Sequence, residues 1–256
     1  EAEKNAKKLL SQIKQATAIA DTLSQMKGAA MKLGQILSLH GEDLFPKEVI
    51  AVLSKLQQNS VQMQFSEIEK VLVREFGKDY AKILTEFSKT PIAAASIGQV
   101  HRAVVDGTPV AVKVQYPGVD QSIDSDIDSL ASLLGVLTKL PSMDNFNAVA
   151  DEVKMVLKLE TDYLQEGKNL EFFRKHFDRD ETLVLPEYFP QASTKHVLTT
   201  ELLTGITVQE FAESTASREA RSLIGEKFLE VFYNELFVLG KVQTDPNFGN
   251  YKIQWS

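Results

Sequence analysis

The chain has 256 residues, with 28 Lys+Arg against 35 Asp+Glu, a net charge of −7 and 43% hydrophobic residues. These figures fit one large globular domain or two smaller ones and exclude a disordered chain. The absence of cysteine excludes a disulfide scaffold, a thiol nucleophile and an iron–sulfur cluster. The acidic balance argues against non-specific binding to nucleic acid.

The first part of the chain is predicted to be all-helical. Apolar side chains recur at spacings of three and four over residues 1–40, which predicts an amphipathic helix. A second helix is expected after Pro46, and residues 66–87 are expected to form one or two short helices with Ser66 as N-cap. We therefore expect a helical extension over residues 1–88.

The pattern changes to β-strand after Pro91. Gln99–Val105 and Val110–Tyr116 are rich in β-branched residues, and Asp106-Gly107 between them predicts a hairpin. The remaining predicted elements are helices over 119–138 and 145–176, strands over 183–189 and 196–203, a turn at Gly205 and a long helix over 217–239 that ends at Gly240. The fold class is therefore α+β, with further domains over 89–203 and 204–256.

Two short segments around the hairpin are typical of a nucleotide site. The small residues of Pro91–Val100 would let backbone N–H groups approach a phosphate chain, although a tight packing turn is the simpler interpretation of the loop taken alone. Lys113 follows in a β-branched strand, where protein kinases place a cation on nucleotide phosphates. An exposed strand lysine is the simpler alternative for that residue taken alone.

Two acidic segments complete the pattern. The segment from 160 to 166 is predicted to be one helix that carries three carboxylates, Glu160, Asp162 and Glu166. In kinases a helical glutamate pairs with the nucleotide-binding lysine. A solvated acidic helix face is the alternative interpretation. Asp245 and Asn250 have the Asp-x4-Asn spacing of a kinase catalytic loop, which is common and weak by itself. The order of loop, lysine, glutamate and Asp-x4-Asn is far more specific than any single piece.

Together these segments resemble the UbiB-type atypical kinases, a family associated with ubiquinone biosynthesis. Met31–Gln35 matches the family's K-x-G-Q motif, Ala93–Ser96 its Ala-rich loop and Glu160-x-Asp162 its E-x-D motif. Tyr116–Val119 matches the family sequence after the lysine, and Asp245–Asn250 its catalytic loop. The resemblance runs through most of the chain.

The resemblance implies a protein-kinase-like fold that binds ATP or ADP with Mg²⁺. Lys113 would contact the phosphates, Glu166 would hold Lys113, and Asp245 would position the attacking group. Lys32 would pair with the E-x-D carboxylates and, with Gln35, cover the substrate site. The other implied positions are the nucleotide-covering Ala93, Ala94, Ala95 and Ser96, the adenine-contacting backbone of Glu201 to Leu203, and the metal ligand Asn250.

The implied function is a Mg²⁺-dependent ATPase or phosphotransferase that supports ubiquinone biosynthesis. A catalytically inactive nucleotide-sensing or lipid-binding scaffold is the alternative, and the occluding extension argues against a protein kinase acting on other proteins. The family's D-F-G motif, whose Asp holds Mg²⁺, does not occur in this sequence, so the metal site that the resemblance implies is incomplete in it. Expected partners are a lipid, a quinone precursor or a membrane surface, and proteins of a biosynthetic complex, but no nucleic acid, in an intracellular setting.

Overall fold

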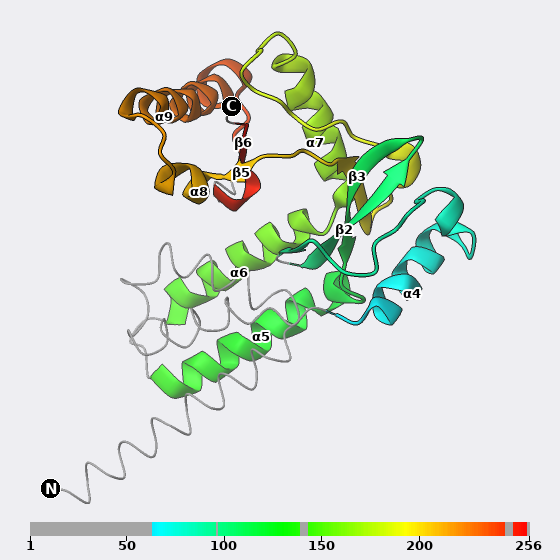
Figure 1. The fold of residues 1–256 in the computed structure, drawn as a ribbon. Coiled ribbons are helices and arrows are strands. Elements are labelled where there is room, and N and C mark those ends of the chain that lie inside the picture. Colours follow the sequence, from blue (N-terminus) through cyan, green and yellow to red (C-terminus); the bar gives the residue numbers. More distant parts are fainter. Residues whose placement is uncertain (1–62, 96, 139–142, 244–247, 255–256) are drawn as a thin grey trace, which may run out of the picture. The chain divides into compact units, whose positions relative to one another are not determined.

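The computed structural model describes residues 63–95, 97–138, 143–243 and 248–254 (Figure 1). The chain divides into two compact units, Glu1–Leu202 and Leu203–Ser256. The helices predicted within residues 1–62 lie outside the described residues. Each unit is described below by itself.

An antiparallel sheet with the strand order β1-β2-β3-β4 forms the centre of the first unit. Its strands are β1 Ala93–Ala95, β2 Gly98–Val105, β3 Thr108–Gln115 and β4 Val197–Glu201. The predicted hairpin is confirmed, because β2 pairs with β3 around Asp106 and Gly107. Both turn residues have positive φ, 50° and 82°, as a type I′ turn requires.

Helix α4 (Phe65–Phe76) covers one face of this sheet. Alternate residues of β3 point into the shared core, which is why Val110, Val112 and Val114 are fully buried. They pack with Ile68 and Leu72 of α4. The helix therefore shares its core with the sheet, and a short 3₁₀ turn, η1 (Tyr80–Lys82), follows it.

The prediction that Ser66 caps α4 is wrong. The N-cap is Gln64, which makes no capping side-chain hydrogen bond, and Ser66 lies inside the first turn. The start of the helix is fixed instead by packing, since the Phe65 ring lies 6.0 Å from that of Phe87. Tertiary contacts thus outweigh the local preference of serine for the cap position.

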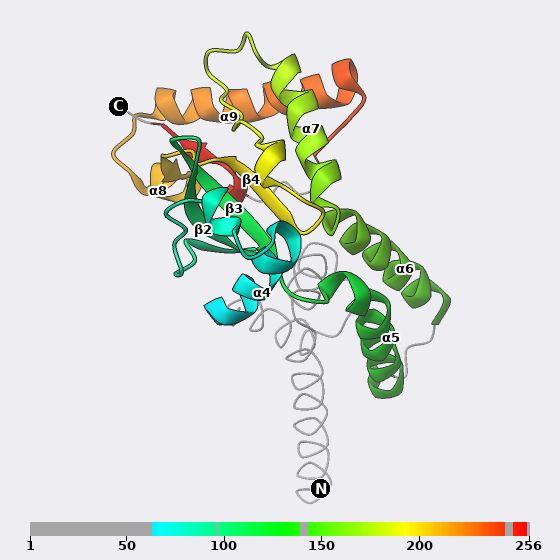
Figure 2. The same ribbon diagram turned by 90° about the vertical axis from the view of Figure 1, so that its right-hand side faces the viewer.

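Helices α5 (Val119–Thr138) and α6 (Met143–Glu160) lie side by side in both views (Figures 1 and 2). Ile123 and Leu157 are fully buried, and Lys158 pairs with Asp124 across the two helices at 2.8 Å. Helix α7 (Tyr163–His176) follows α6 after a two-residue break. The predicted helical stretch over 145–176 is therefore two helices.

The strand predicted over Leu183–Phe189 is wrong. This segment makes one isolated antiparallel bridge, Tyr188 to Thr200, before the 3₁₀ turn η2 (Pro190–Ala192). Pro186 and Pro190 flank the bridge, and proline has no N–H to extend a ladder. The strand predicted over 196–203 is confirmed as β4.

The second unit is built on one long helix. Its elements are β5 Ile206–Thr207, α8 Val208–Glu213, α9 Arg218–Tyr233, the π-helical turn η3 Asn234–Leu239, the 3₁₀ turn η4 Phe248–Asn250 and β6 Lys252–Ile253. The predicted helix over 217–239 is confirmed, with a π-turn at its end and Gly240 left-handed at φ 62°. No helix in the described parts of either unit is long and apolar enough to cross a membrane.

Candidate functional site

Lys113 projects from the sheet face opposite the α4 core. Because residues directly opposite each other share a face, Val100 of β2 and Leu198 of β4 flank it. Ala93 of β1 pairs with Val100, and Ala111 lies two residues before Lys113 on β3. Lys113 therefore lies among small and aliphatic side chains, and all but Leu198 of these are at least partly exposed. A second cation, the exposed Arg102 of β2, lies on the same face opposite Ala111.

The structure brings Lys113 and Glu166 together from positions 53 residues apart. The Lys113 ammonium donates to both oxygens of the Glu166 carboxylate, at 3.0 and 3.2 Å. The side chains are 26% and 42% exposed, so the pair is partly open to solvent. Lys113 Nζ also lies 4.7 Å from the centre of the Tyr163 ring.

The start of α7 is fixed to the sheet by hydrogen bonds on either side of Asp162. The Gln115 side-chain amide donates to the carbonyl of Thr161 at 2.7 Å, and the Tyr163 N–H donates to the carbonyl of Lys195 at 3.2 Å. Asp162 is the N-cap, and its carboxylate accepts the N–H of Gln165 at 3.1 Å. These bonds hold the first turn of α7, and with it Glu166, against β3.

Two residues that the sequence analysis did not single out, Gln115 and Gly167, shape this junction. A Cβ on Gly167 would lie 2.4 Å from the Tyr188 ring, so only glycine lets α7 pack directly on that ring. A glycine next to Glu166 inside a predicted helix was the available signal. Gln115 carried no such signal, because a glutamine in a strand is ordinary.

The E-x-D residues lie where one helix ends and the next begins. Glu160 is the last residue of α6 and Asp162 caps α7, so the reading of Glu160 to Glu166 as one continuous helix is wrong. A Thr-Asp pair three residues before Gln165 was the missed sign of a new helix start. Lys32 and Gln35 lie outside the described residues, so their pairing with these carboxylates stays a prediction.

The Ala-rich loop contains a short edge strand. Ala95 pairs with Gly98 at the end of the β1–β2 ladder. Ser96 lies outside the described residues. Ala93 and Ala94 are exposed, whereas Gly98 is buried. A Cβ on Gly98 would lie 2.3 Å from the carbonyl oxygen of Val114, so this glycine has a packing role.

The predicted adenine-contacting segment begins at the end of β4. The Glu201 N–H donates to the carbonyl of Glu187 at 2.8 Å, so the protein itself uses that donor. The Leu202 N–H likewise donates to Pro109 at 3.0 Å. The predicted contact with adenine would therefore have to use the other backbone N–H and C=O groups of Glu201 to Leu203. Leu203 is the first residue of the second unit.

The second unit anchors both ends of the predicted catalytic loop. The Gln243 N–H donates to the buried Glu235 carboxylate at 3.0 Å, and the Tyr251 hydroxyl donates to the Gln243 side chain at 2.8 Å. Asn250 is exposed at the end of η4, and Asp245 lies outside the described residues. Glu235 was not foreseen, although a lone acidic residue among apolar neighbours in 234–239 was a signal.

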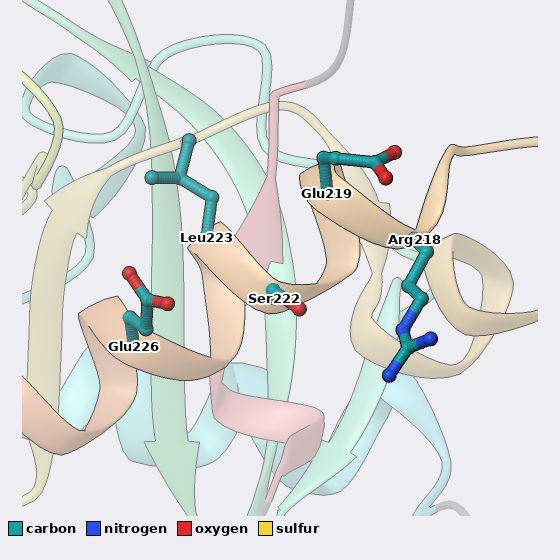
Figure 3. A pocket seen from close by; sticks show the side chains of 5 residues that line it. All are labelled: Arg218, Glu219, Ser222, Leu223 and Glu226. Carbon is teal, nitrogen blue, oxygen red and sulfur yellow. The ribbon is translucent and has the colours of Figure 1, made fainter.

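Two other features of the described residues do not form a site. No group of three or more His, Asp or Glu side chains among them could hold a metal ion. An open depression is lined by residues of α9 alone (Figure 3), namely Arg218, Glu219, Ser222, Leu223 and Glu226. Because one helix supplies every lining residue, this is a helix surface and not a cleft.

The relatives found among known proteins align with nearly the whole chain. The chain is 36% identical over 234 residues to the atypical kinase COQ8, mitochondrial, of Saccharomyces cerevisiae. That alignment covers 91% of this chain and 46% of the yeast protein. It is 34% identical over 250 residues to the probable serine/threonine-protein kinase abkA of Dictyostelium discoideum, covering 93% and 44%. The chain thus spans less than half the length of these two curated relatives.

A solved structure agrees with the sequence relatives. The complex of Rv3197 with erythromycin from Mycobacterium tuberculosis superposes with a TM-score of 0.64 at 30% identity, over 99% of this chain and 64% of that one. The kinase-like α+β fold is therefore confirmed. The model of the ABC1 atypical kinase-like domain matches residues 55–255. The chain belongs to the ABC1 atypical kinase-like domain family, with COQ8 proteins among its homologues.

Proposed function

We propose that the protein binds ATP or ADP with Mg²⁺ and acts as an ATPase or phosphotransferase. The observation that carries this proposal is the Lys113–Glu166 pair, which joins β3 to α7 across 53 residues on a partly open sheet face. An ordinary strand lysine would not need a helix held in place by Gln115 to supply its counter-ion. Kinases use such a pair to aim the ammonium at nucleotide phosphates.

The sheet face around Lys113 supports binding of a nucleotide in particular. Val100 and Ala111 provide small apolar surface for a base, and the ammonium provides charge for phosphates. The exposed Ala93 and Ala94 border this face, where backbone approach to a phosphate chain is unhindered by large side chains. The backbone from Glu201 to Leu203 would meet the base.

The metal would enter with the nucleotide. Mg²⁺ commonly binds substrate phosphates and needs only one or two protein ligands, which fits a chain whose described residues contain no cluster of metal-binding carboxylates. Asn250 would supply one oxygen ligand, and the bound ion would neutralise phosphate charge. Asp245 would orient the group that attacks the terminal phosphate.

The proposed role in the cell is support of ubiquinone biosynthesis, which follows from the family resemblance and the COQ8 homologues. A lipid or quinone precursor, at a membrane surface or within a biosynthetic complex, would be the partner. Lys32 and Gln35 would cover the site where a protein substrate docks in ordinary kinases. This arrangement favours small-molecule or lipid chemistry over phosphorylation of proteins.

Turnover of ATP by the full-length protein tests the proposed activity. We expect hydrolysis that requires Mg²⁺ and that falls by at least about two orders of magnitude in Asp245→Asn, because removing one charge-positioning group commonly costs that much. Asp178→Asn, at an exposed position, is the matched control. Nucleotide binding without any turnover would favour the scaffold alternative, and phosphate transfer to an added protein would favour a true protein kinase.

A further inference from the structure

Tyr163 is a fully buried aromatic residue one turn before Glu166 on α7. Its ring lies beneath the Lys113 ammonium, 4.7 Å from ring centre to Nζ. The ammonium is therefore held by two groups of the same helix turn, a carboxylate and a ring face. An aromatic face attracts a cation through its quadrupole, most strongly where water is excluded.

The hydroxyl of Tyr163 plays no part in this contact. It is buried and has no hydrogen-bond partner. Burial, with the negative charges of Glu166 and Glu160 adding to it, raises the pKa of Tyr163 well above its ordinary value. The ring thus stays neutral, and what it offers Lys113 is its π-face.

We propose that Tyr163 is a positioning residue for Lys113. Its ring confines the ammonium, so that the Lys113 side chain is already ordered when nucleotide phosphates bind. Lysine has large side-chain freedom, and a group that is ordered before binding loses less entropy when the ligand arrives. Glu166 alone would fix the charge but not the path of the flexible stem. With both contacts in place the Lys113 side chain is still 26% exposed, so it remains accessible to a ligand. This inference rests on the proposed nucleotide function for its consequence, but not for the contact itself.

The contact is tested first without nucleotide, by the rate at which a small acylating reagent modifies Lys113, measured by mass spectrometry. A side chain that is confined by two contacts presents its nitrogen to the reagent less often, so a held Lys113 reacts slowly. Tyr163→Phe should leave the rate unchanged. Phenylalanines carrying one, two and three fluorines at position 163 keep the ring shape but weaken its negative face, and should raise the rate stepwise. The exposed Lys82 is the internal reference.

The consequence is tested by the affinity of the full-length protein for Mg²⁺-ATP. Tyr163→Phe should bind like wild type, and Tyr163→Leu should bind about three- to tenfold more weakly, the size expected of a partly shielded cation–π contact. Phe189→Leu is the matched control for loss of a buried ring, because Phe189 packs in the core that α4 shares with the sheet, away from Lys113. It should change neither the Lys113 rate nor the affinity.

Two results would overturn the inference: a modification rate that is flat across the fluorinated series, or a Tyr163→Phe protein that behaves like Tyr163→Leu. The fluorinated forms keep the test decisive even if Tyr163→Leu fails to fold. Failure of the proposed function is a separate result. A wild-type protein that binds no nucleotide would refute that function, while the modification rates would still decide whether the ring holds Lys113.

Discussion

The two units differ in how completely their functional residues are supported. In the first unit, the Lys113–Glu166 pair rests on a helix fixed by Gln115 and on a sheet whose other face is fully packed. Among the described residues of the second unit, the buried apolar core is small, namely Phe211, Ala216 and Ile253. Along α9 and η3 large apolar side chains are exposed, among them Leu223, Leu229, Phe232, Tyr233, Phe237 and Val238.

This difference shows that the cation site is specified within the first unit. Every contact described for Lys113, Glu166 and Tyr163 is made by residues of that unit. The second unit supports its loop differently, through Glu235 and Gln243 at the loop's base. We therefore expect substitutions in the first unit to change packing and the lysine together, and those in the second to act mainly on the loop.

The largest expected effect is at Gly98. Gly98→Ala would push a methyl group to 2.3 Å from the Val114 carbonyl oxygen, and backbone cannot move aside as a flexible side chain can. We expect a loss of about 3 kcal/mol in the free energy of unfolding, measured by chemical denaturation. Gly225→Ala in α9 is the matched control, because nothing lies within 4 Å of its added Cβ.

Gly225→Ala should instead stabilise the protein by about 0.5–1 kcal/mol, because alanine favours the helix interior. The two substitutions add the same methyl group to the two units with opposite results. Equal effects at both positions would contradict the difference in packing.

The next effect concerns the loop of the second unit. Glu235→Ala removes the acceptor of the Gln243 N–H, at a cost of about 1 kcal/mol. Hydrogen exchange at Gln243 should become faster, while the amides of β3 keep their protection. The exposed Glu230 offers the matched control, Glu230→Ala. If Gln243 exchanges at an unchanged rate, Glu235 does not anchor the loop.

The smallest expected effect is a dependence of the free energy of unfolding on pH. Burial raises the pKa of Glu75, but hydrogen bonds from Thr194 and Arg74 and the charge of His196 outweigh it and place the pKa below its ordinary value of 4.5. A carboxylate with a lowered pKa stabilises the folded state above pH 4.5, and this contribution is lost as the pH falls through the folded pKa.

The difference in unfolding free energy between wild type and Glu75→Gln should thus be largest above pH 4.5 and shrink below it. Measuring the chemical denaturation midpoint of both proteins over a range of pH gives this difference. Glu210→Gln is the exposed counterpart in the second unit; the Thr207 backbone lowers the pKa of Glu210 too, but solvent screens that interaction. A larger acid dependence from Glu210 than from Glu75 would reverse the comparison.

The parts of the fold that follow from local chemistry were predictable. The Asp106-Gly107 turn requires positive φ at both positions, and that requirement is visible in the sequence. Gly240 likewise ends its helix in the left-handed conformation. Ser66 and the strand predicted over 183–189 show the opposite case, because packing of Phe65 and the flanking prolines decided those segments.

The candidate site was predictable in part for the same reason. Spacing placed Lys113 on a strand and Glu166 on a helix, and the structure joins them. Gln115 and Tyr163 could not be found in this way, because their roles depend on partners that are distant in the sequence or on the helix break at Asp162. Local patterns indicate which residues carry the chemistry, whereas the residues that hold them in place emerge only from tertiary contacts.

The most direct test of the central claim is the stabilisation of the full-length protein by Mg²⁺-nucleotide in a thermal melt. Ligand at a hundredfold excess over its Kd adds about 2.7 kcal/mol to the folded state, which is easily measured. We predict that wild type and the control Lys82→Met show this shift, whereas Lys113→Met loses it and Glu166→Gln retains only part of it. A Lys113→Met protein that keeps the full nucleotide shift would contradict the assignment of Lys113 as the phosphate-binding cation.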